Sequence, residues 1–167
     1  MNASPDNGSI LPEGWLRRFD GERLAGRAGE AAILATVDAE DWPHLAFLSV
    51  GEVFAPDTSR LYFATWARSR STQNLQRHGK ASLFVALGGS VWEARLRVRQ
   101  CNAGTDEALV VSAGEVIAVR EHAAPYASVL GLVSFQLEEV AEAITRWERQ
   151  IDMLRKYSEN GAGSTTS

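Results

Sequence analysis

The stretch that decides the fold runs from Leu61 to Phe84 and reads LYFATWARSRSTQNLQRHGKASLF. Residues 60–66 at its start are rich in aromatic side chains, which is typical of a strand. Residues 71–78 predict one or two helical turns, because Gly79 stands just past their end. The apolar residues 81–87 predict a second strand. The stretch therefore predicts a strand, a basic loop, a short helix and another strand, in that order.

Two further strands are expected before this stretch. Residues 31–37 and 43–53 are apolar, partly β-branched runs separated by turn-like residues, and Gly51 breaks the second run. Residues 55–59 contain Pro, Asp and Ser and predict another turn. This turn would join the second run to the first strand of the stretch as a hairpin.

More strands are expected after the stretch. Gly88-Gly89 predicts a tight turn into a strand at 91–99. Arginine alternates with apolar residues along that strand, at Arg95, Arg97 and Arg99, so one face should be wet and the other buried. Residues 129–138 predict the last strand.

The segment from 103 to 127 leaves two interpretations open. Residues 108–112 and 115–120 could form a hairpin around Ala113-Gly114, or the first of these pieces could be helical.

Helices are expected near both ends of the chain. Pro12 suits a first helical turn, and the segment that it opens is helical up to Glu30, with Gly21 and Gly26 splitting it into short pieces. After Glu138, apolar residues recur at steps of four and three, which predicts one face of a long helix. These residues are Val140, Ile144, Trp147, Ile151 and Leu154.

The composition predicts one domain at 12–158, with disordered polar ends at 1–11 and 159–167. The net charge of −4 argues against nucleic acid as a partner. One cysteine cannot form an intrachain disulfide, and no signal-peptide pattern is present, so a cytoplasmic location is expected. No apolar run is long enough to span a membrane. A mainly antiparallel β protein with peripheral helices is therefore expected.

The basic loop carries the clearest chemical signal. From Arg68 to Thr72 it offers two guanidinium groups, three hydroxyl groups and the start of a helix. Such donors bind phosphate well. Local chemistry alone also allows a solvated basic loop capped by Ser71.

Other chemistry finds little support. Nucleotide-binding, nucleophile-elbow and zinc-protease motifs do not occur. His44, His78, His122 and Cys101 lack the spacing of metal ligands, so no metal site is expected. Cys101 is interpreted as a small buried hydrophobe and Trp147 as a packing residue.

The segment 61–84 resembles the cofactor-binding segment of the pyridoxamine 5'-phosphate oxidase superfamily, and the order of strands matches over residues 30–100. The resemblance implies a six-stranded antiparallel split β-barrel that binds FMN between two identical subunits. Arg70 would take the place of the family's phosphate-binding lysine. Because Ser69 stands where the family often has arginine, Arg68 would supply that charge.

The resemblance assigns further residues to the FMN site. The strand His44, Leu45, Ala46, Phe47, Leu48 and Ser49 would run along the flavin ring, and Phe63 and Ala64 would border it. Ser71 would join the phosphate loop, and Asn74 matches an asparagine in the helix of smaller family members. Trp92 could cover the ring from the partner subunit.

This chain also departs from the true oxidases. Ser49 replaces the lysine that binds substrate phosphate, and nothing after Glu138 matches their C-terminal segment with its Trp and Arg. Formation of pyridoxal 5'-phosphate is therefore not expected, and no catalytic residue is assigned.

Three functions remain open. The chain could be an FMN-dependent oxidoreductase of a small organic substrate, or a non-catalytic flavin-binding or stress-associated protein. The same barrel could instead bind deazaflavin or haem. A homodimer is expected, with Leu83, Val85, Leu96 and Val98 as apolar faces left for the partner.

Overall fold

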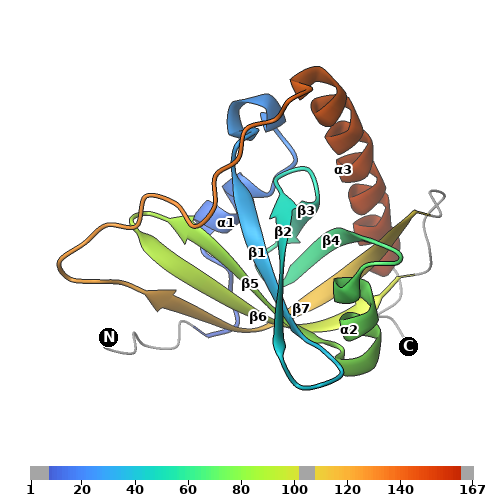
Figure 1. The fold of residues 1–167 in the computed structure, drawn as a ribbon, viewed down its shortest axis with the longest axis horizontal. Helices are drawn as coiled ribbons and strands as arrows, with labels where there is room; N and C mark the ends of the chain where they lie inside the picture. Colours follow the sequence, from blue (N-terminus) through green and yellow to red (C-terminus); the bar gives the residue numbers. More distant parts are fainter. Residues whose placement is uncertain (1–7, 102–107, 163–167) are drawn as a thin grey trace.

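The computed structural model describes residues 8–101 and 108–162. Seven antiparallel strands form one sheet that curls into a half-barrel, in the order β2-β1-β5-β6-β7-β4-β3 (Figure 1). The strands are β1 (Ala31–Val37), β2 (Pro43–Ser49), β3 (Val53–Asp57), β4 (Arg60–Trp66), β5 (Lys80–Leu87), β6 (Ser90–Gln100) and β7 (Leu109–His122). The helices are α1 (Glu13–Arg18), the 3-10 helix η1 (Leu24–Arg27), α2 (Arg70–His78) and α3 (Val140–Ala162). The mainly β architecture is confirmed, but with seven strands instead of six.

The main core lies inside the curl of the sheet. Alternate residues of the strands point inward, as the two-residue period of a strand requires, and α1 adds Trp15. Leu83, Val85, Leu96 and Val98 are all buried in this core. The expectation that they form a free apolar face for a partner is therefore wrong. Arg95, Arg97 and Arg99 are exposed, as their alternation predicts.

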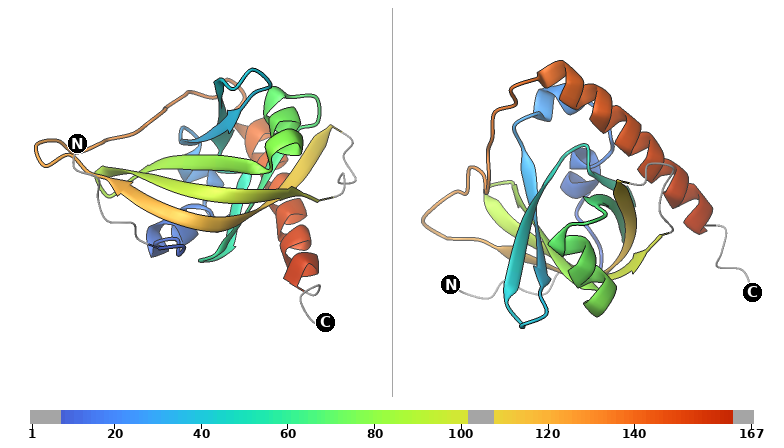
Figure 2. Two further views of the ribbon diagram at one scale, coloured as in Figure 1. Left: turned by 90° about the horizontal axis from the view of Figure 1, so that it is seen from below. Right: turned by 45° about the vertical axis from the view of Figure 1, so that its right-hand side comes forward.

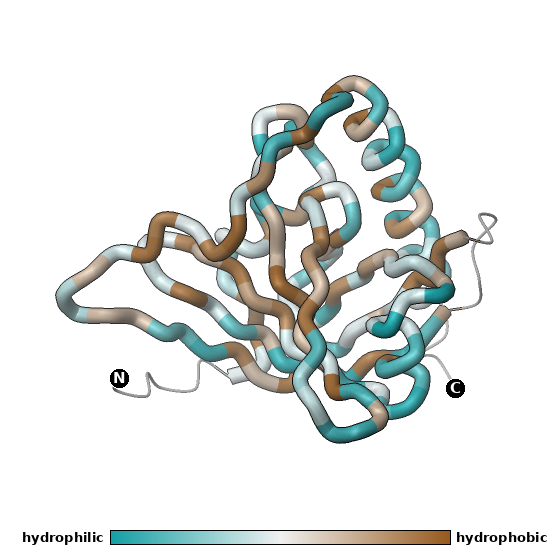
Figure 3. The backbone as a smooth tube through the Cα atoms, in the orientation of Figure 1, coloured by the Kyte–Doolittle hydropathy of each residue, from teal (hydrophilic) through white to brown (hydrophobic). Residues whose placement is uncertain are grey.

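A second core lies under α3, which crosses one side of the sheet next to β3 and β4 (Figure 2). Hydrophobic and hydrophilic residues alternate along this helix (Figure 3). Trp147, Ile151 and Leu154 are buried against Tyr62 and Val111, which confirms the predicted helical face. Val140 does not belong to that face: it is the first helical residue and is exposed.

The additional strand is β3. It includes residues 55–57, which the sequence pattern assigned to a turn at 55–59. The turn is only Thr58-Ser59, and the Asp57 carboxylate holds it by accepting hydrogen bonds from the Ser59 amide and from Arg60. Pro56 lies within the strand because β3 is at the edge of the sheet, where a missing amide donor costs no ladder bond.

Both interpretations of residues 108–120 are wrong, because residues 109–120 lie in the single long strand β7. Ala113 and Gly114 do not turn; they pair with β6 on one side and β4 on the other. A Cβ atom on Gly114 would lie 3.1 Å from the side chain of Leu96. This glycine therefore allows close packing inside a strand and does not mark a turn.

The prediction of a last strand at 129–138 is also wrong. Residues 123–139, called the strap below, connect β7 to α3 in an extended path along the outside of the sheet (Figure 1). Within 129–138, the bridge between Ser134 and Glu30 is the only strand-like pairing in the described structure. Phe135 and Leu137 are half-buried between exposed neighbours, whereas Leu132 and Val133 are both half-buried. The alternation of burial over residues 134–138 comes from packing on the domain, without a hydrogen-bonded ladder.

The ends of the domain extend beyond the expected limits. Leu11 is buried, and its amide donates a hydrogen bond to the carbonyl of Thr58. α3 continues to Ala162. The rest of the expected disordered ends, 1–7 and 163–167, lies outside the described residues. In the described part of the chain, no helix is long and apolar enough to cross a membrane.

Gly51 connects β2 to β3 directly beneath α3. A Cβ atom at this position would lie 2.1 Å from Cβ and Cγ of Trp147. We expect Gly51→Ala to destabilise the protein by about 1–3 kcal/mol, because the buried indole must shift. Urea unfolding measures the change. Gly26→Ala is the control, because a Cβ there meets nothing within 4 Å; equal losses in both variants would contradict the packing argument.

Candidate functional site

The basic loop between β4 and α2 is held by side-chain hydrogen bonds. Ser69 is the N-cap of α2, and its Oγ accepts a hydrogen bond from the Thr72 amide at 3.2 Å. Thr72 Oγ1 donates to the carbonyl of Trp66 at 2.8 Å and lies 2.7 Å from Thr65 Oγ1. The expectation that Ser71 caps the helix is wrong, because Ser71 lies within the first turn and is buried.

The start of α2 presents donors and positive charge to solvent. The amide of Gln73 donates to the carbonyl of Ser69, so the amides of Arg70 and Ser71 precede the first helical bond and lack an intrahelical acceptor. The side chains of Arg68 and Arg70 are exposed, and neither forms an ion pair with another described residue. These groups can receive an anion. Ser71 is only 2% exposed, so the groups that the helix start presents to solvent are the two arginine side chains.

Buried polar contacts fix α2 on the sheet. Asn74 Nδ2 donates to Thr36 Oγ1 at 3.0 Å, and Thr36 lies within 3.5 Å of the carbonyl of His44 on β2. On the other side, Gln100 Nε2 donates to the carbonyl of Thr72 at 3.0 Å. Asn74 is 4% exposed. Its side chain therefore connects elements of the fold, and it lies behind the donors at the helix start.

The strand 44–49 divides its side chains between two faces of the sheet. Leu45 and Phe47 are 54% and 60% exposed and lie opposite Ala35 and Ile33 of β1. Ala46 and Leu48 pack against the main core, so they offer a ligand only backbone. The stretch therefore presents an apolar outer face formed by every second residue.

The other predicted cofactor residues lie deeper. Phe63 and Ala64 are fully buried in β4, and Trp92 is half-buried against the core. Ser49, at the end of β2, is buried and donates to Glu52. The structure thus brings the exposed arginines to the start of α2 and the apolar side chains to β2. The buried residues support these two surfaces.

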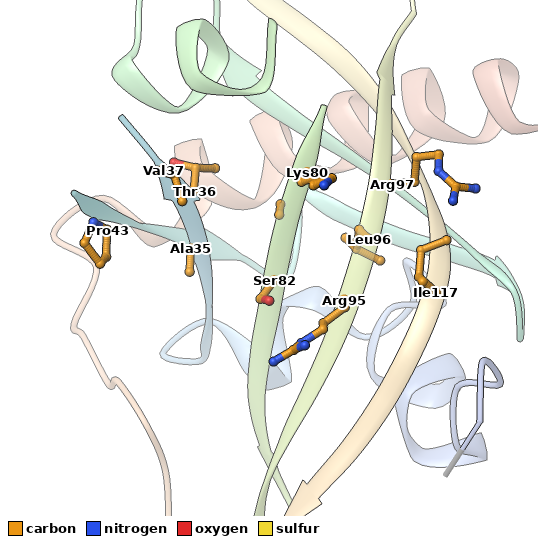
Figure 4. Close-up of a pocket in the computed structure, with 11 residues that line it drawn as sticks. Ala35, Thr36, Val37, Pro43, Lys80, Ser82, Arg95, Leu96, Arg97 and Ile117 are labelled. Carbon is orange, nitrogen blue, oxygen red and sulfur yellow. The ribbon is translucent and has the colours of Figure 1, made fainter. Parts of the chain in front are cut away.

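A groove of about 510 Å³ lies across β1, β5, β6 and β7 (Figure 4). Its apolar residues include Val37, Pro43 and Ile117, and its cationic ones are Lys80, Arg95 and Arg97. Sequence reasoning assigned none of these residues to a site. The alternation of Arg95 and Arg97 with apolar residues predicted that one face of β6 is exposed to solvent. It could not predict the groove, because residues of four strands form it.

Glu93 is a buried carboxylate at the same outer face. It accepts hydrogen bonds from Ser82 Oγ at 2.8 Å and Arg95 Nε at 2.9 Å, and His122 Nε2 lies 3.6 Å away. Burial raises its pKa, but the hydrogen bonds from Arg95 and Ser82 outweigh burial and hold the pKa of Glu93 below its ordinary value. This carboxylate orients Arg95 at the edge of the groove.

The stability that Glu93 contributes should depend on pH. Because its pKa is lowered in the folded state, the contribution is complete above the ordinary glutamate pKa and is lost as pH falls through the lowered value. We expect Glu93→Gln to cost about 1–3 kcal/mol of unfolding free energy at pH 7, with a smaller difference in acid. The matched control, Glu115→Gln, removes an exposed pair with Arg97 and should cost at most about 1 kcal/mol. A difference between Glu93→Gln and the native protein that stays constant down to pH 2 would contradict this assignment.

Cys101 and the described clusters of metal-binding residue types give no reactive or metal site. Burial raises the pKa of the half-buried Cys101 thiol, which disfavours the reactive thiolate. Within residues 8–101 and 108–162, no three His, Cys, Asp or Glu side chains gather as metal ligands would.

Comparison with known proteins gives one family. The family model for pyridoxamine 5'-phosphate oxidase matches residues 27–159. The chain is 27% identical over 140 residues to the uncharacterised protein YclD of Bacillus subtilis (strain 168), which covers 83% of this chain and 91% of the relative.

Solved structures share the fold at low sequence identity. A candidate pyridoxamine 5'-phosphate oxidase from Lactobacillus delbrueckii matches with a TM-score of 0.53 and 18% identity, over 70% of this chain and 98% of that chain. An F420 reductase matches with a TM-score of 0.50 and 15% identity, over 65% and 98%. A conserved protein from Mycobacterium tuberculosis matches with a TM-score of 0.51 and 15% identity, over 75% and 97%.

Proposed function

The chain belongs to the pyridoxamine 5'-phosphate oxidase family, and we propose that it is an FMN-binding oxidoreductase that acts on a small organic substrate. The fold of this family binds flavins and deazaflavins. The observation that carries the proposal is the start of α2, a helix that contacts β2, where the exposed side chains of Arg68 and Arg70 flank the helix N-terminus.

The residues present suit FMN. Its phosphate would meet the N-terminus of α2 and the guanidinium groups of Arg68 and Arg70, which together provide charge and directional donors. Its aromatic ring would lie against Leu45 and Phe47, which offer exposed apolar area. Bound flavin supplies the redox chemistry, while these residues position it and exclude water.

A second copy of the chain would complete the site. One subunit leaves Leu45, Phe47, Trp66 and Ile117 more than two-fifths exposed, and the cation-lined groove lies on the same outer face of the sheet. A partner barrel that covers this face would exclude water from a ring bound on β2. The homodimer that we propose therefore places two sites between subunits. Sedimentation of the FMN-bound protein as an 18 kDa species would contradict it.

Two other functions share the barrel. A deazaflavin would use the same anion-binding helix start, and an F420 reductase has this fold; the mass and absorption spectrum of the co-purified cofactor separate flavin, deazaflavin and haem. A non-catalytic flavin-binding protein would hold FMN without turnover. Oxidation of reduced nicotinamide by the FMN-bound protein, with a small acceptor present, separates the enzyme from the non-catalytic protein.

Arg70→Ala should weaken FMN binding roughly 10- to 150-fold, because losing a charge-assisted bond to phosphate costs about 1.5–3 kcal/mol. Arg77→Ala is the matched control: Arg77 is exposed in the last turn of the same helix, away from its start. Titration of apoprotein by flavin fluorescence measures both. Equal losses of FMN affinity in the two variants would show that the phosphate does not bind at this loop.

Riboflavin tests the phosphate contact itself, because it has the FMN ring without the phosphate. It should bind apoprotein at least about tenfold more weakly than FMN, since an unpaired charged group costs more than about 1.4 kcal/mol. The difference should shrink as salt rises, because Arg68 and Arg70 are open to solvent. Equal affinity for the two flavins would exclude this loop from the site.

A further inference from the structure

A second, smaller pocket lies at the end of β2, where the strand approaches α3 and the strap. Its volume is about 300 Å³. Phe47 and Ser49 of β2 form one side, Phe135 of the strap another, and Trp147 of α3 a third. Ala31, Val133 and Leu137 complete the apolar lining, so the walls are largely apolar and three of their side chains are aromatic. Phe47 also belongs to the outer face of β2, so the pocket opens beside the surface proposed for the flavin ring.

One carboxylate, that of Glu52, lies in this largely apolar pocket. Glu52 Oε2 accepts hydrogen bonds from the amide of Ser49 at 2.7 Å and from its hydroxyl at 2.9 Å. Both bonds end on the same oxygen, so Oε1 is the atom that can meet a ligand. Burial raises the pKa of Glu52, against the opposing effects of the Ser49 hydrogen bonds and the positive charge of Arg146. The carboxylate thus has lost part of its hydration without gaining an ion-pair partner within 4 Å in the described structure.

A poorly hydrated carboxylate among aromatic rings favours one class of ligand. A cation restores the lost electrostatic stabilisation of the carboxylate, and the faces of Phe and Trp rings attract cations. An anionic group would be repelled by Glu52, although Arg146 at the same pocket would attract it. Arg146, which is exposed on α3 and lines the pocket, reduces by its positive charge the attraction of the pocket for any cation.

We propose that this pocket binds the ammonium group of a small organic cation, which donates a hydrogen bond to Glu52 Oε1. This inference rests on the proposed function in one respect: it names the charge of the molecule that lies next to the flavin. It also gives Ser49 a role of its own. The hydroxyl and amide of Ser49 fix the carboxylate, so the end of β2 selects positive charge.

The test compares benzylammonium with benzyl alcohol, a neutral molecule of similar shape, on the full-length protein as purified with its flavin. Titration calorimetry at pH 7.5 should show benzylammonium binding at least about tenfold more tightly than the alcohol, as one charge-assisted hydrogen bond provides. Glu52→Gln should remove this preference while retaining an oxygen for Ser49. Arg146→Gln should strengthen benzylammonium binding, because a nearby positive charge is lost.

Glu142→Gln is the matched control, because Glu142 is exposed one turn earlier on α3 and does not line the pocket; it should keep the preference. Binding of benzylammonium should weaken in acid as Glu52 takes up a proton. Equal affinity of the native protein for the two probes, or a preference that survives Glu52→Gln, would overturn the proposal. FMN affinity is measured separately for each variant. If the chain binds no FMN, the proposed function fails while the two-probe comparison still decides whether the pocket selects cations.

Discussion

Buried polar side chains need hydrogen-bond partners, and this requirement fixes the position of α2 on the sheet. Thr65, Thr72, Asn74 and Thr36 are all buried between α2 and the sheet. Each is costly to bury alone, and the bonds that join Thr65 to Thr72 and Asn74 to Thr36 allow few positions for the helix. α2 is therefore fixed against β1 and β4 at once. Its first amides and the neighbouring arginines have a defined place as a result.

Local pattern was sufficient for most of the fold. The alternation in β6, the glycine after α2 and the spacing of Trp147, Ile151 and Leu154 each depend on residues close in sequence, and each predicted its element. The failures depend on distant partners. Pro56 is acceptable only because β3 is an edge strand, and Gly114 is explained only by Leu96 across the sheet. The strap imitates a strand because packing on the domain also buries alternate residues.

The candidate site was predictable to a similar degree. The exposed Arg68 and Arg70 at a helix start follow from the loop sequence, and Leu45 and Phe47 lie in the predicted strand. Sequence could not separate these from Ala46 and Leu48, because the face of a strand depends on what packs behind it. The groove with Lys80, Arg95 and Arg97 and the pocket at Glu52 combine residues from several elements, so no short motif marks either of them.

The packing of α3 has a consequence for the order in which the chain is made. Val50, Tyr62, Ala64 and Val111 are buried with the helix in one cluster, although they are synthesised well before it. While the chain emerges from the ribosome, these residues lack the cover of α3 until residues 140–162 have been made. The strands that pair first therefore carry an open apolar side during synthesis, which is the condition that recruits chaperones or leads to aggregation. A nonsense mutation or proteolytic cut shortly before α3 would leave the sheet in this state permanently.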